Sequence, residues 1–376
     1  MSIQIIEGGV CAPKGFLANG IHDVDKKDGV YSAPSLICSK KLANAAAILS
    51  SNKVKSDSLL LSKKNIENGR ASAILLTRGS ANACVKGGYE AACELASALG
   101  GALKISPRNV MISSSGDVGV PLDVASISDA IPELASGVGC CYGITKKECA
   151  VSFEIDGKLC RMGGIAAGDG QTVAIITTDC AISSEMLSLA LAADAQNTLE
   201  LVSFDGRCTP SDTIMALANG MAKNKEITKR GKDFIEFAKA LNVINLILAR
   251  KIAADTTSGT KLIECSVVGA RNDTVAKAIA KGVVSAPYVK SDVRSATPVW
   301  GHIISAVGAV GVELNPQKID VSLISDSGEI PVCSCGVGVN FSEEFAREVL
   351  SQKEITIAIK LSDGVGEATA WGSDKS

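Results

Sequence analysis

Residues 162–183, MGGIAAGDGQTVAIITTDCAIS, carry the clearest structural signal in this chain. Their four glycines let the backbone adopt left-handed conformations and come close to a ligand. The β-branched run 173–176 that follows predicts a buried strand. Thr172 stands where the loop meets this strand, and a hydroxyl held there by a rigid element is a candidate nucleophile. The alternative interpretation is a tight loop before a core strand, with no chemical role.

The composition predicts about two domains with well-filled cores in a chain of 376 residues. Hydrophobic residues make up 46% of the chain but aromatic residues only 3%, so Ala, Val, Ile and Leu must build the cores. The 38 basic and 40 acidic residues are intermixed, which predicts no basic face and no nucleic-acid partner. With neither a secretion signal nor a run of 18 apolar residues, we expect a cytoplasmic protein without a membrane segment.

The 13 cysteines are an odd number in a large chain, which favours free thiols in a reducing compartment over a disulfide framework. The sequence has no C-x-x-C motif and only two histidines, His22 and His302, so we expect no metal site and no cofactor. Cys84 and Cys180 lie beside candidate loops, and the sequence leaves open whether one of them is the nucleophile or both are small buried side chains.

The rest of the chain alternates strand and helix patterns, which predicts an α/β architecture in layers. The loops at 79–84, 114–119 and 163–172 are rich in small residues and are expected to converge on one pocket. Strands are expected at 71–77, 110–113, 149–155, 159–165, 199–204, 261–268, 319–324 and 354–361. Helices are expected at 91–99, 124–135, 184–191, 210–219, 232–254, 273–284, 300–307 and 342–350.

Short motifs distributed over nearly the whole chain point to one known family. They are GGV at 8–10, APKGF at 12–16, NAC at 82–84, SSGDVG at 114–119, GGIA at 163–166, TTD at 177–179, GTKLIE at 259–264, WGHII at 300–304 and ATAWG at 368–372. Each motif is weak alone, but in this order they resemble the ornithine acetyltransferase family, the bifunctional glutamate N-acetyltransferases of arginine biosynthesis.

The resemblance implies an Ntn-like αββα sandwich over residues 1–260 and a smaller α/β domain over 261–376, whose last strands are candidates for a return to the sandwich. Family members cut their own chain before a threonine, which then carries an acetyl group from N-acetylornithine to glutamate without metal or cofactor. By resemblance, Ser115 and Gly116 match the oxyanion hole, and Glu264 matches the carboxylate that holds the amino end of the substrate. A small amino-acid substrate and a homo-oligomer are therefore expected.

The chain also departs from the family pattern. Ala167 stands where the family has a lysine, and the loop before the strand is several residues shorter. The nucleophile position of the family consequently falls on Gln171, with Thr172 one place further on. A one-residue slip turns a strand side chain to the opposite face, so Thr172 replaces the nucleophile only if the shorter loop restores the register. Cys141-Tyr142 replaces a threonine pair, and no residues match the C-terminal tail of the family.

Three interpretations of function follow. The first is a divergent acyltransferase that uses Thr172 with Ser115 and Gly116. The second is a non-catalytic homologue with a binding or assembly role, and the third is an amide hydrolase or an enzyme with another acyl acceptor. Since Gly168 and Gly170 can relax where self-cleavage needs a strained bond, we expect the Gln171–Thr172 bond to stay intact and acetyl transfer to be weak or absent.

Overall fold

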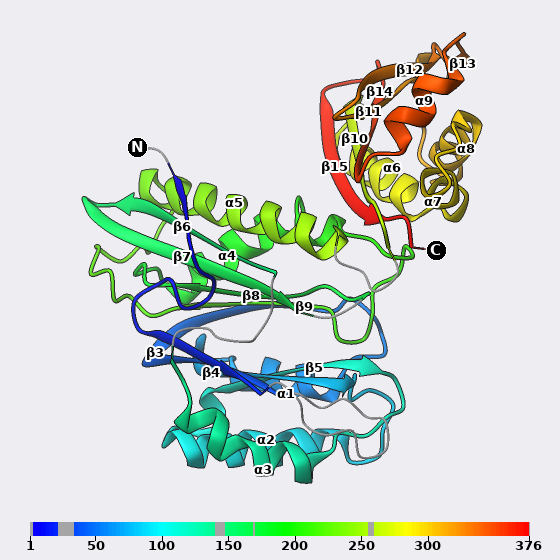
Figure 1. Cartoon of the computed structure of the whole chain (residues 1–376). Coiled ribbons are helices and arrows are strands. Elements are labelled where there is room, and N and C mark those ends of the chain that lie inside the picture. Colours follow the sequence, from blue (N-terminus) through cyan, green and yellow to red (C-terminus); the bar gives the residue numbers. More distant parts are fainter. Residues whose placement is uncertain (1–2, 22–33, 140–146, 168–169, 255–258, 376) are drawn as a thin grey trace. The chain divides into compact units, whose positions relative to one another are not determined.

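The computed structural model describes residues 3–21, 34–139, 147–167, 170–254 and 259–375, and the chain divides into two compact units (Figure 1). Unit 1 consists of residues 1–194 and 208–248, and unit 2 of residues 195–207 and 249–376. Residues 195–207 belong with unit 2, where the hydroxyls of Ser203 and Ser285 lie 2.7 Å apart. The domain division at 260/261 that the sequence indicates stays a prediction.

The strands of unit 1 form two stacked layers that share one long strand, β3 (Ser35–Leu49). Its first part pairs with β2 (Phe16–Gly20) and β4 (Arg70–Ser80), and β4 pairs in parallel with β5 (Val110–Asp117). After a register shift, its second part pairs with β9 (Thr213–Ala218). The second layer continues outward through β8 (Val173–Thr178), β7 (Lys158–Ala167), β6 (Glu148–Ile155) and β1 (Gln4–Ile6).

Helices cover the outer faces of both layers (Figure 1). On the side of β4 and β5, α2 (Gly88–Leu103) and α3 (Val124–Ser136) share one apolar core with these strands, and α1 (Asp57–Asn65) packs beside β5. On the other side lie α4 (Ser184–Ala195) and α5 (Lys232–Ala254). A methyl group on Gly164 of β7 would come within 2.8 Å of Leu248, so this glycine lets α5 pack closely on the sheet. The αββα sandwich predicted from the sequence is thus confirmed.

The space between the two layers is filled by small and medium apolar side chains. Ile74 and Leu76 of β4 and Met111 of β5 meet Val173 and Ile175 of β8 in one buried cluster. All six residues of β8 are buried, as predicted for the run 173–176. Because aromatic side chains are nearly absent from this cluster, the two layers can pack closely, and this packing fixes one layer relative to the other.

Residues 210–219 are predicted as a helix, but most of them, Thr213–Ala218, instead form the central strand β9. The Asp212 carboxylate accepts hydrogen bonds from the Thr209 amide at 2.9 Å and from its hydroxyl at 2.6 Å, so the helix-start signal closes a turn instead. A strand that is paired on both sides and buried on both faces carries apolar side chains on both faces. It therefore lacks the alternation of apolar and polar residues by which a strand is recognised in a sequence. Residues 199–201 form a 3₁₀ turn where a strand was expected, and α2 continues through Gly100-Gly101, where its end was predicted.

Unit 2 contains a six-stranded sheet in the order β13 (Val337–Gly338), β12 (Gly328–Ser334), β11 (Asp320–Ser325), β14 (Glu354–Lys360), β10 (Leu262–Ala270) and β15 (Gly366–Ser373). Its helices are α6 (Asp273–Ser285), α7 (Pro287–Arg294), α8 (Trp300–Ala309) and α9 (Glu343–Leu350). The last strands pair with β10 in this sheet, so the suggested return to the sandwich is wrong.

Replacing Ile175 by Ala tests the contact between the layers. Ile175 is fully buried, so the Ile175→Ala variant should lose about 2–5 kcal/mol of unfolding free energy through the cavity it leaves. Ile235→Ala on α5 is the matched control, because Ile235 is 53% exposed and should cost little. Urea denaturation followed by circular dichroism measures both. Equal losses in the two variants would contradict the proposed packing.

Candidate active site

The parallel strands β4 and β5 end side by side and bring two predicted loops together. Arg78 pairs with Ser115 and Gly79 with Gly116 in the ladder. Gly116 has a φ of +139°, and a Cβ at this position would lie 2.3 Å from the carbonyl carbon of Gly79. Only glycine fits so close a backbone approach. The pairing of β4 with β5 therefore requires the glycine of the SSGDVG motif, and the same segment is the candidate oxyanion loop.

The loop at 79–84 is anchored against the same edge. The Ala81 amide donates to the Asp117 carbonyl at 3.0 Å, and the Gly119 amide donates to the Ala83 carbonyl at 2.9 Å. Asn82, fully buried in a left-handed conformation, donates to the Ser58 hydroxyl and to the Gly88 carbonyl, both at 2.9 Å. These bonds hold the two loops as one rigid unit.

The start of β8 reaches this unit through Gln171. Its side-chain amide donates to the Gly116 carbonyl at 3.4 Å, and its oxygen accepts from the Ser211 hydroxyl at 3.0 Å. The structure thus brings part of the third predicted loop, residues 170–172, to the candidate oxyanion residues; residues 168–169 lie outside the described part of the chain.

Thr172 faces the other way. Val173 and Ile175 belong to the core between the sheets, and because side chains alternate along a strand, Gln171 shares their face whereas Thr172 shares the face of Ala174. The Thr172 amide donates to the Asp212 carboxylate at 2.9 Å, and its carbonyl accepts from the Thr213 amide at 2.8 Å. The role of Thr172 as the nucleophile stays a prediction, and it requires the segment 170–172 to rotate.

Ser115 keeps its hydroxyl close to where an oxyanion donor would be needed. The hydroxyl is half-buried and donates to the Thr77 carbonyl at 3.2 Å. The neighbouring Ser114 hydroxyl, on the opposite face, is instead locked between Ser58 at 2.7 Å and Thr77 at 2.9 Å. Ser115 is consequently the residue of this pair that can exchange its partner for a ligand oxygen.

The two alternative cysteines differ in environment. Cys180 is fully buried, and its thiol pKa is raised well above the ordinary value by hydrogen bonding to the Cys160 thiol and by burial. A thiol held protonated in this way is a poor nucleophile. Cys84 is exposed, on the loop that contacts Asp117 and Gly119. Ten described cysteines are free thiols, as expected, but Cys11 forms a disulfide, which the sequence interpretation missed.

Glu264 lies on β10 in unit 2, in a cluster of charged side chains. Its Oε2 accepts hydrogen bonds from Arg250 at 2.5 Å and from the Trp371 indole at 2.8 Å. Arg250 also donates to Glu354 at 2.7 Å. Two carboxylates share one guanidinium, so the cluster keeps a net negative charge that suits an ammonium ligand.

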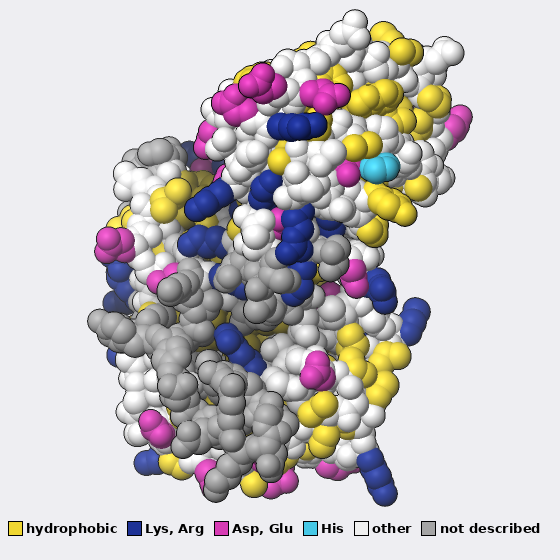
Figure 2. Space-filling model, turned by 45° about the vertical axis from the view of Figure 1, so that its right-hand side comes forward, with side chains coloured by type: hydrophobic (Ala, Val, Ile, Leu, Met, Phe, Trp, Pro, Cys, Tyr) yellow, Lys and Arg dark blue, Asp and Glu magenta, His cyan; other side chains and the backbone are white. Residues whose placement is uncertain are grey.

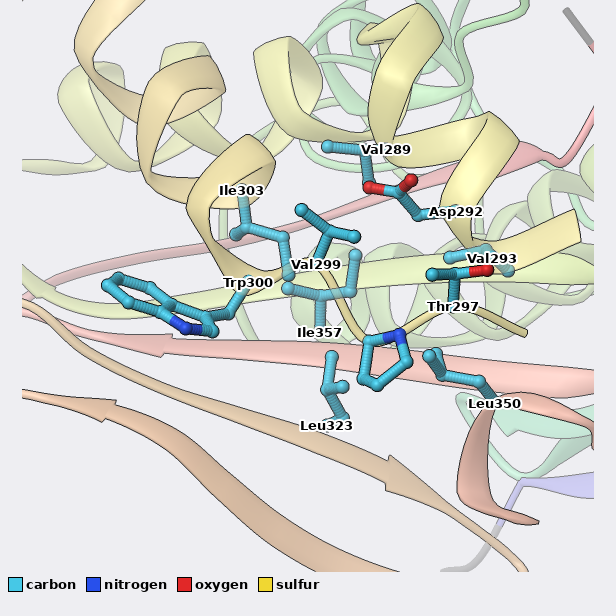
Figure 3. A pocket seen from close by; sticks show the side chains of 11 residues that line it. Val289, Asp292, Val293, Thr297, Val299, Trp300, Ile303, Leu323, Leu350 and Ile357 are labelled. Atoms are coloured by element: carbon cyan, nitrogen blue, oxygen red, sulfur yellow. The ribbon is translucent and has the colours of Figure 1, made fainter. Parts of the chain in front are cut away.

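A small apolar cavity in unit 2 lies between α7, α8 and the sheet (Figure 3). Its volume is about 10 Å³, and its one charged residue, Asp292, already accepts a hydrogen bond from His302 Nδ1 at 2.6 Å. The His302 ring stacks on Tyr288 with centroids 5.1 Å apart. Basic and acidic side chains are both spread over the face that Figure 2 shows. A volume of roughly one water molecule excludes an amino-acid ligand, so this cavity is a packing gap.

Sequence reasoning missed two side chains at this edge, Arg78 and Ser211. The sequence analysis places Arg78 just after a predicted strand whose pairing partner could not be known, and it assigns Ser211 to a helix. Across the described residues, no group of three or more His, Cys, Asp or Glu side chains is arranged to hold a metal ion. No helix in that part of the chain is long and apolar enough to span a membrane.

Comparison with known proteins agrees with this architecture. The model of the ArgJ family matches residues 18–376. The arginine biosynthesis bifunctional protein ArgJ of Caldanaerobacter subterraneus subsp. tengcongensis is 34% identical over 393 residues, covering 100% of this chain and 97% of that protein. ArgJ 1 of Clostridium acetobutylicum is 33% identical over 377 residues, covering 95% and 91%. The crystal structure of the Bacillus halodurans ArgJ protein is 35% identical with a TM-score of 0.50, covering 53% of this chain and 92% of that chain.

Two sheets with helices on both outer faces, and a glycine-containing loop at the edge of one sheet, define an Ntn-like αββα protein. The chain belongs to the ArgJ family. The resemblance inferred from the motifs is thereby confirmed.

Alkylation should distinguish the thiols. We expect iodoacetamide at pH 7.5 to modify the exposed Cys84, whereas Cys180 stays unmodified because burial and the raised pKa keep it protonated and inaccessible. Cys335, also exposed, is the control for a cysteine outside the candidate site. Peptide mass spectrometry after digestion reports each site. Modification of Cys180 at the rate of Cys84 would show that the described burial is incorrect.

Proposed function

We propose that this chain is an acyltransferase that moves an acetyl group from N-acetylornithine to glutamate, with Ser115 and Gly116 as the oxyanion loop and Thr172 as the candidate nucleophile. The observation that carries the proposal is the contact between Gln171 and Gly116, which brings the start of β8 to the oxyanion loop within one rigid framework. Family membership supports acetyl transfer, because the relatives are named for arginine biosynthesis.

The chemistry needs three groups near one reacting carbonyl. A hydroxyl must attack, a base must take its proton, and donors must hold the oxyanion that forms. Ser115 supplies a donor once its hydroxyl leaves the Thr77 carbonyl. Thr172 supplies a hydroxyl only after the segment 170–172 rotates, since its side chain lies on the opposite face from Ser115. An uncut Thr172 has no free amine to act as the base, so its proton must pass to solvent water, and we therefore expect transfer to be slow.

A second candidate function is favoured by the same geometry. Gln171 occupies the position facing the oxyanion loop, and an amide side chain bonded to Gly116 and Ser211 is chemically inert there. A chain of this kind would bind N-acyl amino acids without transferring the acyl group. It would retain the sandwich and the loops, and it would remain a single polypeptide.

Intact mass and transfer rate distinguish the two functions. We expect one species of 38.6 kDa, because the backbone at Thr172 is fixed by Asp212 and Thr213 and, among residues 170–172, only Gly170 has a positive φ. We also expect slow acetyl transfer from N-acetylornithine to glutamate. Ser115→Ala should lower its rate by about tenfold to a thousandfold if the hydroxyl stabilises the oxyanion.

The controls decide between the candidates. Ser114→Ala removes the neighbouring hydroxyl on the opposite face and should leave the transfer rate largely unchanged in any protein that remains folded. Gln171→Thr places a hydroxyl beside Gly116 and should raise the rate. Binding of N-acetylornithine with no transfer by the unmodified chain would favour the second candidate, and two fragments meeting at Thr172 would refute the uncut chain.

For Glu264 we propose the role of holding the amino end of the substrate. Glu264→Gln keeps an acceptor for Trp371 but removes a charge, so N-acetylornithine should bind on the order of tenfold more weakly. N-acetylnorvaline, which lacks the side-chain amine, should bind the variant and the unmodified chain equally. Calorimetry measures both ligands. An equal loss for both would assign Glu264 to the structure and not to recognition of the amine.

A further inference from the structure

Arg78 lies at the carboxyl end of β4, directly beside Ser115 on β5. Leu76, two residues earlier on β4, belongs to the core between the sheets, so alternation places Arg78 on that inner face. Paired residues of parallel strands point to the same side, and Ser115 faces the same way. Arg78, a half-buried residue, therefore lies next to the candidate oxyanion loop, at the strand ends where α/β proteins bind ligands.

Within the described residues the Arg78 guanidinium has no ion-pair or hydrogen-bond partner. The carboxylate that follows on β5, Asp117, is exposed and makes no ion pair with Arg78. Arg250 and Arg271, in contrast, are held by glutamate side chains at 2.5 Å and 2.7 Å. A guanidinium that is partly removed from water and lacks an anion gains most from a ligand that carries one.

An independent observation comes from Ser113, which pairs with Leu76 in the same ladder. Its hydroxyl is 2% exposed and has no hydrogen-bond partner in the described part of the chain. Met111 precedes it by two residues and lies in the inner core, so Ser113 also faces the space between the sheets. Buried hydroxyls are normally bonded, and this one lies one step diagonally from Arg78.

We propose that Arg78, assisted by Ser113, forms a carboxylate-binding subsite that orients an N-acyl amino acid by its carboxylate and so directs its acyl group to Ser115 and Gly116. The planar guanidinium would bind the two carboxylate oxygens in a bidentate manner, and the Ser113 hydroxyl would donate to one of them. The choice of N-acyl amino acids as ligands depends on the proposed function, whereas the preference for an anion depends on Arg78 alone.

Binding of N-acetyl-L-norvaline and of its carboxamide, measured by calorimetry, tests the subsite. The two probes differ only in the carboxylate and carry no side-chain amine. We expect the unmodified chain to bind the acid more tightly than the amide. The Arg78→Gln substitution should lower the affinity for the acid on the order of tenfold to a hundredfold and change the affinity for the amide little. Arg78→Lys should give an intermediate affinity, because lysine keeps the positive charge but not the planar guanidinium that binds both carboxylate oxygens.

Two further variants control for folding. Arg108→Gln removes an exposed arginine at the opposite end of the β5 segment and should leave both affinities unchanged. Ser113→Ala should lower the affinity for the acid without lowering the midpoint of thermal unfolding, because the lost hydroxyl has no hydrogen-bond partner among the described residues of the free protein. Equal binding of acid and amide, no binding of the acid by the unmodified chain, or an unchanged affinity in Arg78→Gln would overturn the subsite. Binding that follows the expected pattern without acetyl transfer would retain the subsite and refute the proposed transfer.

Discussion

The apolar contact between the two sheet layers of unit 1 is the constraint on which the candidate site depends. Ile74, Leu76 and Met111 on one layer meet Val173 and Ile175 on the other, and all are buried. Removing such surface from water stabilises the sandwich and leaves little freedom for either sheet to slide. Because β5 and β8 belong to different layers, this contact, together with the shared strand β3, sets the distance between the oxyanion loop and Gln171.

The period of two along a strand then determines which side chains meet. Arg78, Ser113, Ser115 and Gln171 share the faces that look into the sandwich, whereas Thr77, Ser114 and Thr172 occupy the opposite faces. The outward hydroxyls of Thr77 and Ser114 are consumed by bonds to each other and to Ser58 on α1. Among the inward groups, Arg78 and Ser113 keep donors that a ligand could use. Adjacent residues on one strand therefore differ in role: the Ser114 hydroxyl is structural, whereas the Ser115 hydroxyl on the other face is available to a ligand.

Several buried polar groups elsewhere tie distant segments together. The buried Asp179 carboxylate accepts the Arg161 amide at 2.7 Å and the Lys14 amide at 3.0 Å, which fixes the N-terminal segment to the end of β8, and burial raises its pKa. In unit 2, Lys290 is 2% exposed and donates to the carbonyls of Phe204 and Lys375, and burial lowers its pKa. Such groups are satisfied by main-chain atoms, and their role is structural.

The sequence by itself determined the layered α/β class, the family and most helices, because these features depend on local periodicity and on ordered motifs. It also predicts a role for Ser115 and Gly116, and it places Gln171 at the nucleophile position of the family. Strand β9 could not be recognised, because a strand buried on both faces shows no alternation and Pro210 with Asp212 imitates a helix start. Only the tertiary structure decided that Arg78 lies beside Ser115 and that Thr172 faces away, since both facts depend on strand pairing between segments distant in the chain.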